Sequence, residues 1–157
     1  MNGISSFSIN KLDVKLAECL RHRNGSYVEI GANNGIQQSN SKYFETFKGW
    51  RGVLIEPAID NFIELKRNRN KGNYFANYNC VPFDYSEKYV NLIYSDLMTT
   101  SIGLENDLES MEKQIGESKK YLKRGTVHSF QAKACTMNKI LVESTLPNKI
   151  EFPRQAR

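Results

Sequence analysis

Residues 27–35 read YVEIGANNG, an apolar and β-branched run that leads directly into a turn with two glycines and few bulky side chains. Gly31 and Gly35 lack a Cβ atom, so a ligand could pack against the backbone of such a turn. A helix that begins after the turn would offer free backbone N–H groups to a carboxylate or a phosphate. Close packing of a helix on a strand also requires glycine, and the turn by itself does not separate these two interpretations.

An acidic residue ends the next predicted strand. The stretch RGVLIEP places Glu56 twenty-five positions after Gly31. In nucleotide-binding α/β folds, an acid at the end of the second strand accepts hydrogen bonds from the hydroxyls of a ribose. Glu56 could instead cap the following helix, but Pro57 and Ala58 separate it from the helical pattern. The glycine turn and Glu56 together predict a cofactor that contains adenosine.

The turn also indicates which cofactor this would be. The dinucleotide pattern G-x-G-x-x-G is absent, because Asn33 stands where the second glycine would let a pyrophosphate approach the backbone. Glu29, two positions before the first glycine, suits a cofactor with a positive ammonium group better than one with a diphosphate. These residues favour S-adenosylmethionine. An NAD-binding oxidoreductase, which would share the use of Glu56, is the less favoured alternative.

Helices and strands alternate in the segments that would position these residues. Apolar spacing predicts three helices, with Gly49 ending the second, and three strands between them. This order predicts a parallel sheet with crossover helices, and apolar runs such as GVLI suit strands that are covered on both faces. We therefore expect an α/β fold with a doubly wound, Rossmann-like sheet. The predicted helices cover 9–21, 39–50 and 59–69, and the predicted strands 26–32, 51–57 and 73–81.

The pattern changes after Pro82. Two further strands are predicted over 89–97 and 126–135, separated by apolar residues at helical spacing (Leu104, Leu108, Met111 and Ile115). We interpret 84–135 as a β/α insertion after the third strand. Such an insertion is as compatible with a substrate-contacting lid as with a cover for one edge of the sheet. A helix over 137–146 and a strand beginning in NKIEF follow.

Together these stretches resemble the FkbM-type S-adenosylmethionine-dependent methyltransferases. The resemblance rests on YVEIGANNGIQQSNSKYFE, GWRGVLIEP and FIELKRNR, which match the family's E/D-x-G-A-N-x-G turn, Ser-Asn pair, Trp-x-Gly lead-in and I-E-P strand end. It is close over 27–69 and continues loosely to the end of the chain. It implies a Rossmann-like methyltransferase sheet and methylation of a hydroxyl oxygen. The partner would be a small-molecule or glycan acceptor, such as a sugar or a secondary metabolite.

The resemblance also implies roles for individual residues. The expected cofactor-binding residues are Glu29, Gly31, Asn33 and Gly35 at the methionine end, Glu56 at the ribose and Asn79 near the adenine. Ser39 and Asn40 match the family's Ser-Asn pair, and helix N-capping explains them equally well. The catalytic base is not identified. His128 is the most obvious titrating group in the insertion, but a lone histidine in a strand is more often structural.

The sequence departs from the family near its end. The family continues after IEF with a fourth strand that ends in a D-x-E-G motif, whereas this sequence has PRQAR, and proline does not suit a central strand. We therefore expect a single partial domain over 1–157 in which the C-terminal strands are missing, as in a truncated or frame-shifted product. The first strand would then form an exposed apolar edge. A catalytically inactive fragment or binding module remains the alternative.

Composition excludes several other classes. The net charge of +5 invites a nucleic-acid partner, but the basic clusters at 66–71 and 119–124 lie where helices end, and cations are favoured there. No apolar run approaches the roughly 20 residues of a membrane span, and no export signal is apparent at the start, so we expect a cytoplasmic protein. Three scattered cysteines and two histidines lack the spacing of a metal site.

Overall fold

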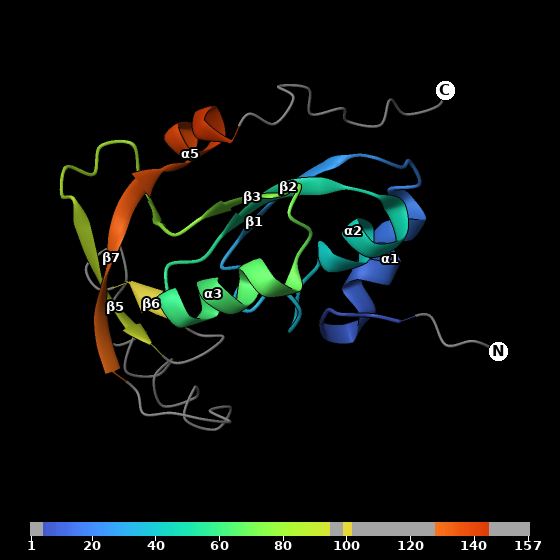
Figure 1. The fold of residues 1–157 in the computed structure, drawn as a ribbon, viewed down its shortest axis with the longest axis horizontal. Helices are drawn as coiled ribbons and strands as arrows, with labels where there is room; N and C mark the ends of the chain where they lie inside the picture. Colours follow the sequence, from blue (N-terminus) through green and yellow to red (C-terminus); the bar gives the residue numbers. More distant parts are fainter. Residues whose placement is uncertain (1–4, 95–98, 102–127, 145–157) are drawn as a thin grey trace.

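The computed structural model describes residues 5–94, 99–101 and 128–144, and the chain has a mixed α/β fold (Figure 1). The first half alternates helices and strands as the apolar pattern predicts. The elements are the 3-10 helix η1 (Ile9–Lys11), α1 (Leu12–Cys19), β1 (Ser26–Ile30), α2 (Lys42–Lys48), β2 (Arg51–Ile55), α3 (Ile59–Asn68), β3 (Tyr74–Ala76), β4 (Asn79–Val81), β5 (Tyr89–Tyr94), β6 (Thr100–Ser101), β7 (His128–Thr136) and α5 (Met137–Glu143).

The first three strands form a parallel sheet in the order β1-β2-β3, which confirms the predicted parallel pairing with crossover helices. Val28 of β1 pairs with Val53 of β2, and Val53 pairs in turn with Tyr74 of β3. Gly49 takes a left-handed conformation (φ 70°) at the C-terminus of α2, so the predicted end of this helix is also confirmed.

Helices cover both faces of this sheet (Figure 1). On one face Leu54 packs with Leu65 of α3, and both side chains are fully buried. On the other face Val53 and Ile55 pack with Ile140 of α5. Successive side chains of a strand point to opposite faces, so β2 needs apolar residues at every position. The structure thus explains the uninterrupted run GVLI.

The second sheet has the order β4-β7-β5-β6, and its formation corrects the prediction of one strand over 73–81. That segment is two short strands: β3 belongs to the first sheet, whereas β4 pairs in parallel with β7. Between them, the Asn77 side chain donates hydrogen bonds to the backbone carbonyls of Glu56 and Pro57. These bonds hold the connecting residues at the end of β2, where the chain passes from one sheet to the other.

The predicted strands of the 84–135 segment are confirmed, because β5 and β7 pair in antiparallel fashion from Tyr89–Lys133 to Tyr94–His128. The predicted helix through Leu104 and Ile115 lies outside the described residues, as does the strand expected in NKIEF. β7 leads directly into α5, which packs on the first sheet. The segment is therefore joined to the first sheet at both ends, by β4 and by α5.

The opening helix is shorter than predicted, and a polar residue anchors it. α1 covers only Leu12–Cys19, and its buried residue is Asp13, whereas Leu12 is exposed. The Asp13 carboxylate accepts hydrogen bonds from the hydroxyls of Ser6 and Ser8 and from the backbone N–H of Phe7. Burial raises the pKa of Asp13, but these bonds outweigh it and hold the pKa below its ordinary value. The predicted helix is therefore confirmed in part, but Leu12 and Cys19 of its apolar spacing are exposed.

Replacement of Leu54 by alanine should lower the free energy of unfolding by about 2–5 kcal/mol, because it removes a fully buried side chain between β2 and α3. Leu12→Ala is the matched control, since Leu12 is 45% exposed, and should cost about 0.5 kcal/mol or less. Urea unfolding followed by circular dichroism measures both. Equal losses in the two variants would contradict this assignment of the core.

Candidate functional site

A cavity of about 200 Å³ lies at the carboxyl ends of β1 and β2. Gly31 and Asn33 line it from the turn after β1, and Glu56 lines it from the end of β2. Asn79 of β4 and Leu92 of β5 contribute the wall on the side of the second sheet. Four of the six residues that the sequence assigned to cofactor binding therefore surround one cavity, at the edge where ligands bind in open α/β sheets.

Gly31 leaves open space at the mouth of this cavity. Its φ is +69°, in the left-handed region that side chains other than glycine rarely adopt. A Cβ atom built at this position would meet no protein atom within 4 Å. Glycine at position 31 thus serves the backbone conformation and also leaves room for a ligand at the end of β1.

The Glu56 carboxylate joins the turn to the start of α3. It is 4% exposed, and its two oxygens accept the backbone N–H groups of Asn33 (2.8 Å) and Ala58 (2.9 Å). α3 begins at Ile59, so Pro57 and Ala58 do separate Glu56 from the helix, although the carboxylate bonds the N–H of Ala58 directly before it. Burial raises the pKa of Glu56, and its bonds to Ala58, Asn33 and Asn61 oppose that rise.

Glu56 keeps capacity for a ligand. A carboxylate offers about four lone-pair sites, and those directed at Asn33, Ala58 and Asn61 do not use all of them. Asn79 is the first residue of β4, and its amide oxygen accepts a hydrogen bond from the Ser101 hydroxyl at 3.3 Å. This bond holds Asn79 against β6, on the side of the cavity formed by the second sheet.

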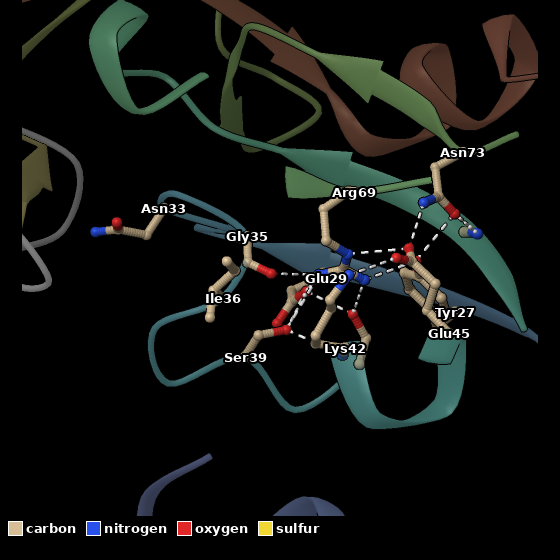
Figure 2. A network of polar contacts seen from close by, with 12 residues as sticks. Tyr27, Glu29, Asn33, Gly35, Ile36, Ser39, Lys42, Glu45, Arg69 and Asn73 are labelled. Atoms are coloured by element: carbon tan, nitrogen blue, oxygen red, sulfur yellow. Dashed lines mark hydrogen bonds and ion pairs between the residues drawn. The ribbon is translucent and has the colours of Figure 1, made fainter. Parts of the chain in front are cut away.

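Glu29 and Gly35 do not line the cavity but belong to a buried polar network, which Figure 2 shows. Glu29 points to the face of β1 opposite to that of Ile30, toward α2 and α3. Its Oε2 accepts hydrogen bonds from the hydroxyls of Ser39 and Ser41, and it forms an ion pair with Arg69 at 3.1 Å. The Oε2 atom of Glu29 is thus bonded to protein partners, on the face of β1 opposite to that of the cavity-lining Ile30.

Arg69 is the centre of this network (Figure 2), and its side chain is fully buried. A guanidinium has five N–H donors, and each nitrogen of Arg69 has acceptors. They are Glu45 Oε2 for Nε (3.0 Å), Glu29 Oε2 (3.1 Å), the Gly35 carbonyl (3.2 Å) and Ser39 Oγ (3.1 Å) for Nη1, and Tyr27 Oη (2.7 Å) and Ser41 Oγ (2.8 Å) for Nη2.

This role cannot be predicted from the sequence, because Arg69 is one of four cations in the cluster KRNRNK. That cluster was explained by the preference for positive charge at a helix C-terminus. The structure agrees for Lys66 and Arg67, which are exposed in the last turn of α3, whereas Arg69 is buried beneath it. Its acid partners Glu45 and Glu29 lie 24 and 40 residues earlier in the chain, so no local pattern connects them with Arg69.

Glu45 of α2 is the second acid in contact with Arg69. It also accepts hydrogen bonds from the ammonium of Lys42 and from the side chains of Asn73 and Tyr27. Burial alone would raise the pKa of Glu45, but the charge and hydrogen bonds of Arg69, together with Lys42 and Asn73, lower it to about 2. Glu45 is therefore ionised throughout the physiological range.

The remaining candidates lie apart from the cavity. Ser39 is buried and accepts the backbone N–H of Lys42, the first residue of α2, although the N-cap position itself is Ser41. Asn40 is exposed. His128 is exposed at the start of β7, where its ring stacks on that of Tyr94 with the centroids 5.1 Å apart. Neither Asn40 nor His128 lines the cavity.

Comparison with protein-family models, with curated proteins and with solved structures found no match. Within the described residues, none of the helices has the length and apolar character that crossing a bilayer requires. The same part of the chain holds no group of three or more His, Cys, Asp or Glu side chains that could bind a metal ion. The chemistry of the site must therefore be argued from the cavity and its residues.

The pKa of Glu45 predicts how stability depends on pH. The folded-state pKa of about 2 lies below the ordinary value of 4.5, so the ionised carboxylate stabilises the fold above pH 4.5. That contribution, about 3 kcal/mol, should be lost as the pH falls from 4.5 toward 2. Urea unfolding at several pH values measures it. In Glu45→Gln the fall should be much smaller, whereas the exposed Glu64→Gln should follow the wild type; identical profiles for all three proteins would refute the assignment.

Proposed function

We propose that this chain is an S-adenosylmethionine-dependent methyltransferase with a Rossmann-like sheet. The observation that carries the proposal is one cavity at the carboxyl ends of β1 and β2 that has Gly31, Asn33, Glu56 and Asn79 around it. The parallel order β1-β2-β3 and the helices on both faces support a doubly wound sheet of this kind. The resemblance of the sequence around these residues to the FkbM-type enzymes is the second ground for the proposal.

The residues around the cavity fit the chemistry of this cofactor. Glu56 has lone pairs left to accept hydrogen bonds from the ribose hydroxyls, and its neighbours in the cavity include the apolar Ile55 and Leu92. Gly31 leaves room for the amino-acid end against the backbone. Asn79, with an amide group at the second sheet, suits the adenine. Glu29 has a different role from the one expected, because its carboxylate is bonded to Arg69, Ser39 and Ser41.

Bound S-adenosylmethionine supplies an electrophilic methyl group, and the acceptor supplies a nucleophilic oxygen. We propose that the acceptor is a hydroxyl of a sugar or a related small molecule. In this reaction the protein holds the methyl donor and the acceptor oxygen in line, which lowers the entropic barrier to methyl transfer. The described residues around the cavity include no histidine, so the removal of the hydroxyl proton is not assigned to a residue.

Titration calorimetry with S-adenosylhomocysteine tests the cofactor assignment. The wild-type chain should bind it, and Glu56→Ala should weaken binding by about tenfold or more, because the ribose hydroxyls lose their acceptor. Glu64→Ala, an exposed acid on the outer part of α3, is the control and should bind like the wild type. Binding of NAD in place of S-adenosylhomocysteine would identify the oxidoreductase alternative. A folded, monodisperse chain that binds neither would refute the proposal.

A second prediction separates the two functions of Gly31. Gly31→Ala places a methyl group in the open space of the cavity, so S-adenosylhomocysteine should bind about tenfold or more weakly. Gly49→Ala is the matched control, because Gly49 has nearly the same φ (+70°) but lies at the end of α2. Both variants should lose about 1–2 kcal/mol of stability through backbone strain. Gly49→Ala should lose somewhat more, because its Cβ atom would lie 2.7 Å from Oδ1 of Asn24. Equal affinity in the two variants would show that Gly31 serves the turn alone.

A further inference from the structure

The turn that connects β1 to α2 has an unusual backbone. Over residues 31–41 it contains neither helix nor strand, and four of its residues have positive φ, namely Gly31, Asn33, Gly35 and Gln38. Two of these carry side chains, for which the left-handed conformation is unfavourable. A segment of this kind keeps one conformation only when its surroundings hold it.

Residues at the end of α3 make many of the contacts that keep the turn in this conformation. Arg69 donates hydrogen bonds to the carbonyl of Gly35 and to the hydroxyls of Ser39 and Ser41. Asn68, the preceding residue, donates to the carbonyl of Asn34 at 2.8 Å. A Cβ atom on Gly35 would lie only 2.7 Å from Cγ of Arg69, so the backbone of the turn rests directly on the arginine side chain. The turn is therefore anchored along most of its length.

The buried charges around Arg69 restrict the position of the 31–41 turn. Arg69 and Lys42 carry two positive charges, and Glu29 and Glu45 carry two negative ones. A buried charge is stable only when it is paired and its hydrogen-bonding groups are satisfied. Because every donor of the guanidinium is directed at an acceptor, a displacement of the turn would leave part of the network without a partner. The network thus favours a single position of the turn.

The same turn reaches the cavity at its other end. Asn33 donates its backbone N–H to Glu56, and in Figure 2 its side chain points away from the guanidinium. Gly31 and Asn33 line the cavity, whereas Gly35, Ser39 and Ser41 contact Arg69. One short segment therefore connects the buried ion pairs to the candidate cofactor site.

We propose that Arg69 is a positioning residue for cofactor binding: its guanidinium holds the 31–41 turn in the conformation that presents Gly31 and Asn33 to the cofactor. Glu29 then acts as the charge partner of Arg69 and does not bind the cofactor itself. This inference rests on the proposed function as far as the ligand is concerned. The ordering of the turn by Arg69 is a property of the protein without its cofactor, so it can be measured separately.

The experiment combines amide hydrogen exchange of the cofactor-free protein with calorimetric titration of S-adenosylhomocysteine. Arg69→Lys keeps the charge but replaces five fork-like donors by three on one nitrogen. In this variant the amides of 31–41 should exchange about tenfold or more faster, while those of β2 stay unchanged, and the ligand should bind about tenfold or more weakly. Arg67→Lys, at an exposed position two residues earlier, is the control and should match the wild type in both measurements.

Glu29→Gln separates positioning from direct contact and serves also if Arg69→Lys does not fold. Positioning predicts that faster exchange over 31–41 and weaker binding appear together in Glu29→Gln. Weaker binding with unchanged exchange would mean that Glu29 contacts the ligand, and it would overturn the proposal. Unchanged affinity and exchange in a folded Arg69→Lys would overturn it as well. If the wild type does not bind S-adenosylhomocysteine, the proposed function fails, and exchange over 31–41 still decides whether Arg69 orders the turn.

Discussion

The buried guanidinium of Arg69 is the interaction on which the rest of this structure depends. It lies between β1, α2 and α3, and it carries a full charge in a position without access to water. Such a charge is tolerated only with complete hydrogen bonding. Arg69 directly follows α3, and its acceptors come from β1, from α2 and from the turn between them. Arg69 therefore determines how closely α2 and α3 approach β1, together with the apolar contacts of these elements.

Glu56 performs a similar function on the other side of the turn. Its carboxylate accepts one N–H from the turn and one from the start of α3, so the ends of β1 and β2 are held at a set distance from the helix. The raised pKa shows that burial works against its ionised form. A group kept in such a place, at the wall of a cavity and with lone pairs to spare, is typical of a ligand-binding position. Glu56 and Arg69 thus hold one backbone segment, the 31–41 turn, from its two sides.

The passage from β3 to β4 decides the shape of the cavity. If residues 73–81 had continued as one strand, Asn79 and Cys80 would have extended the first sheet. The chain instead crosses at Asn77 into the second sheet, and there β4 and β5 supply the opposite wall with Asn79 and Leu92. A cavity between two sheets is lined by side chains from both of them. The edge of a single sheet would supply side chains from one side only. The apolar face of β5 and β7 around Val90 and Ala132 supports this wall from behind.

The sequence by itself determined the order of helices and strands in the first sheet and the meeting of the glycine turn with Glu56. Both follow from local signals: apolar periodicity, glycine and proline at element ends, and the rule that parallel strands end at one edge. The tertiary structure alone decided that Glu29 faces Arg69, forty residues later in the chain, and that the third predicted strand divides between two sheets. Ion pairs and strand partners depend on distances in space, so a pattern read along the chain shows which residues need partners but not which partners they find.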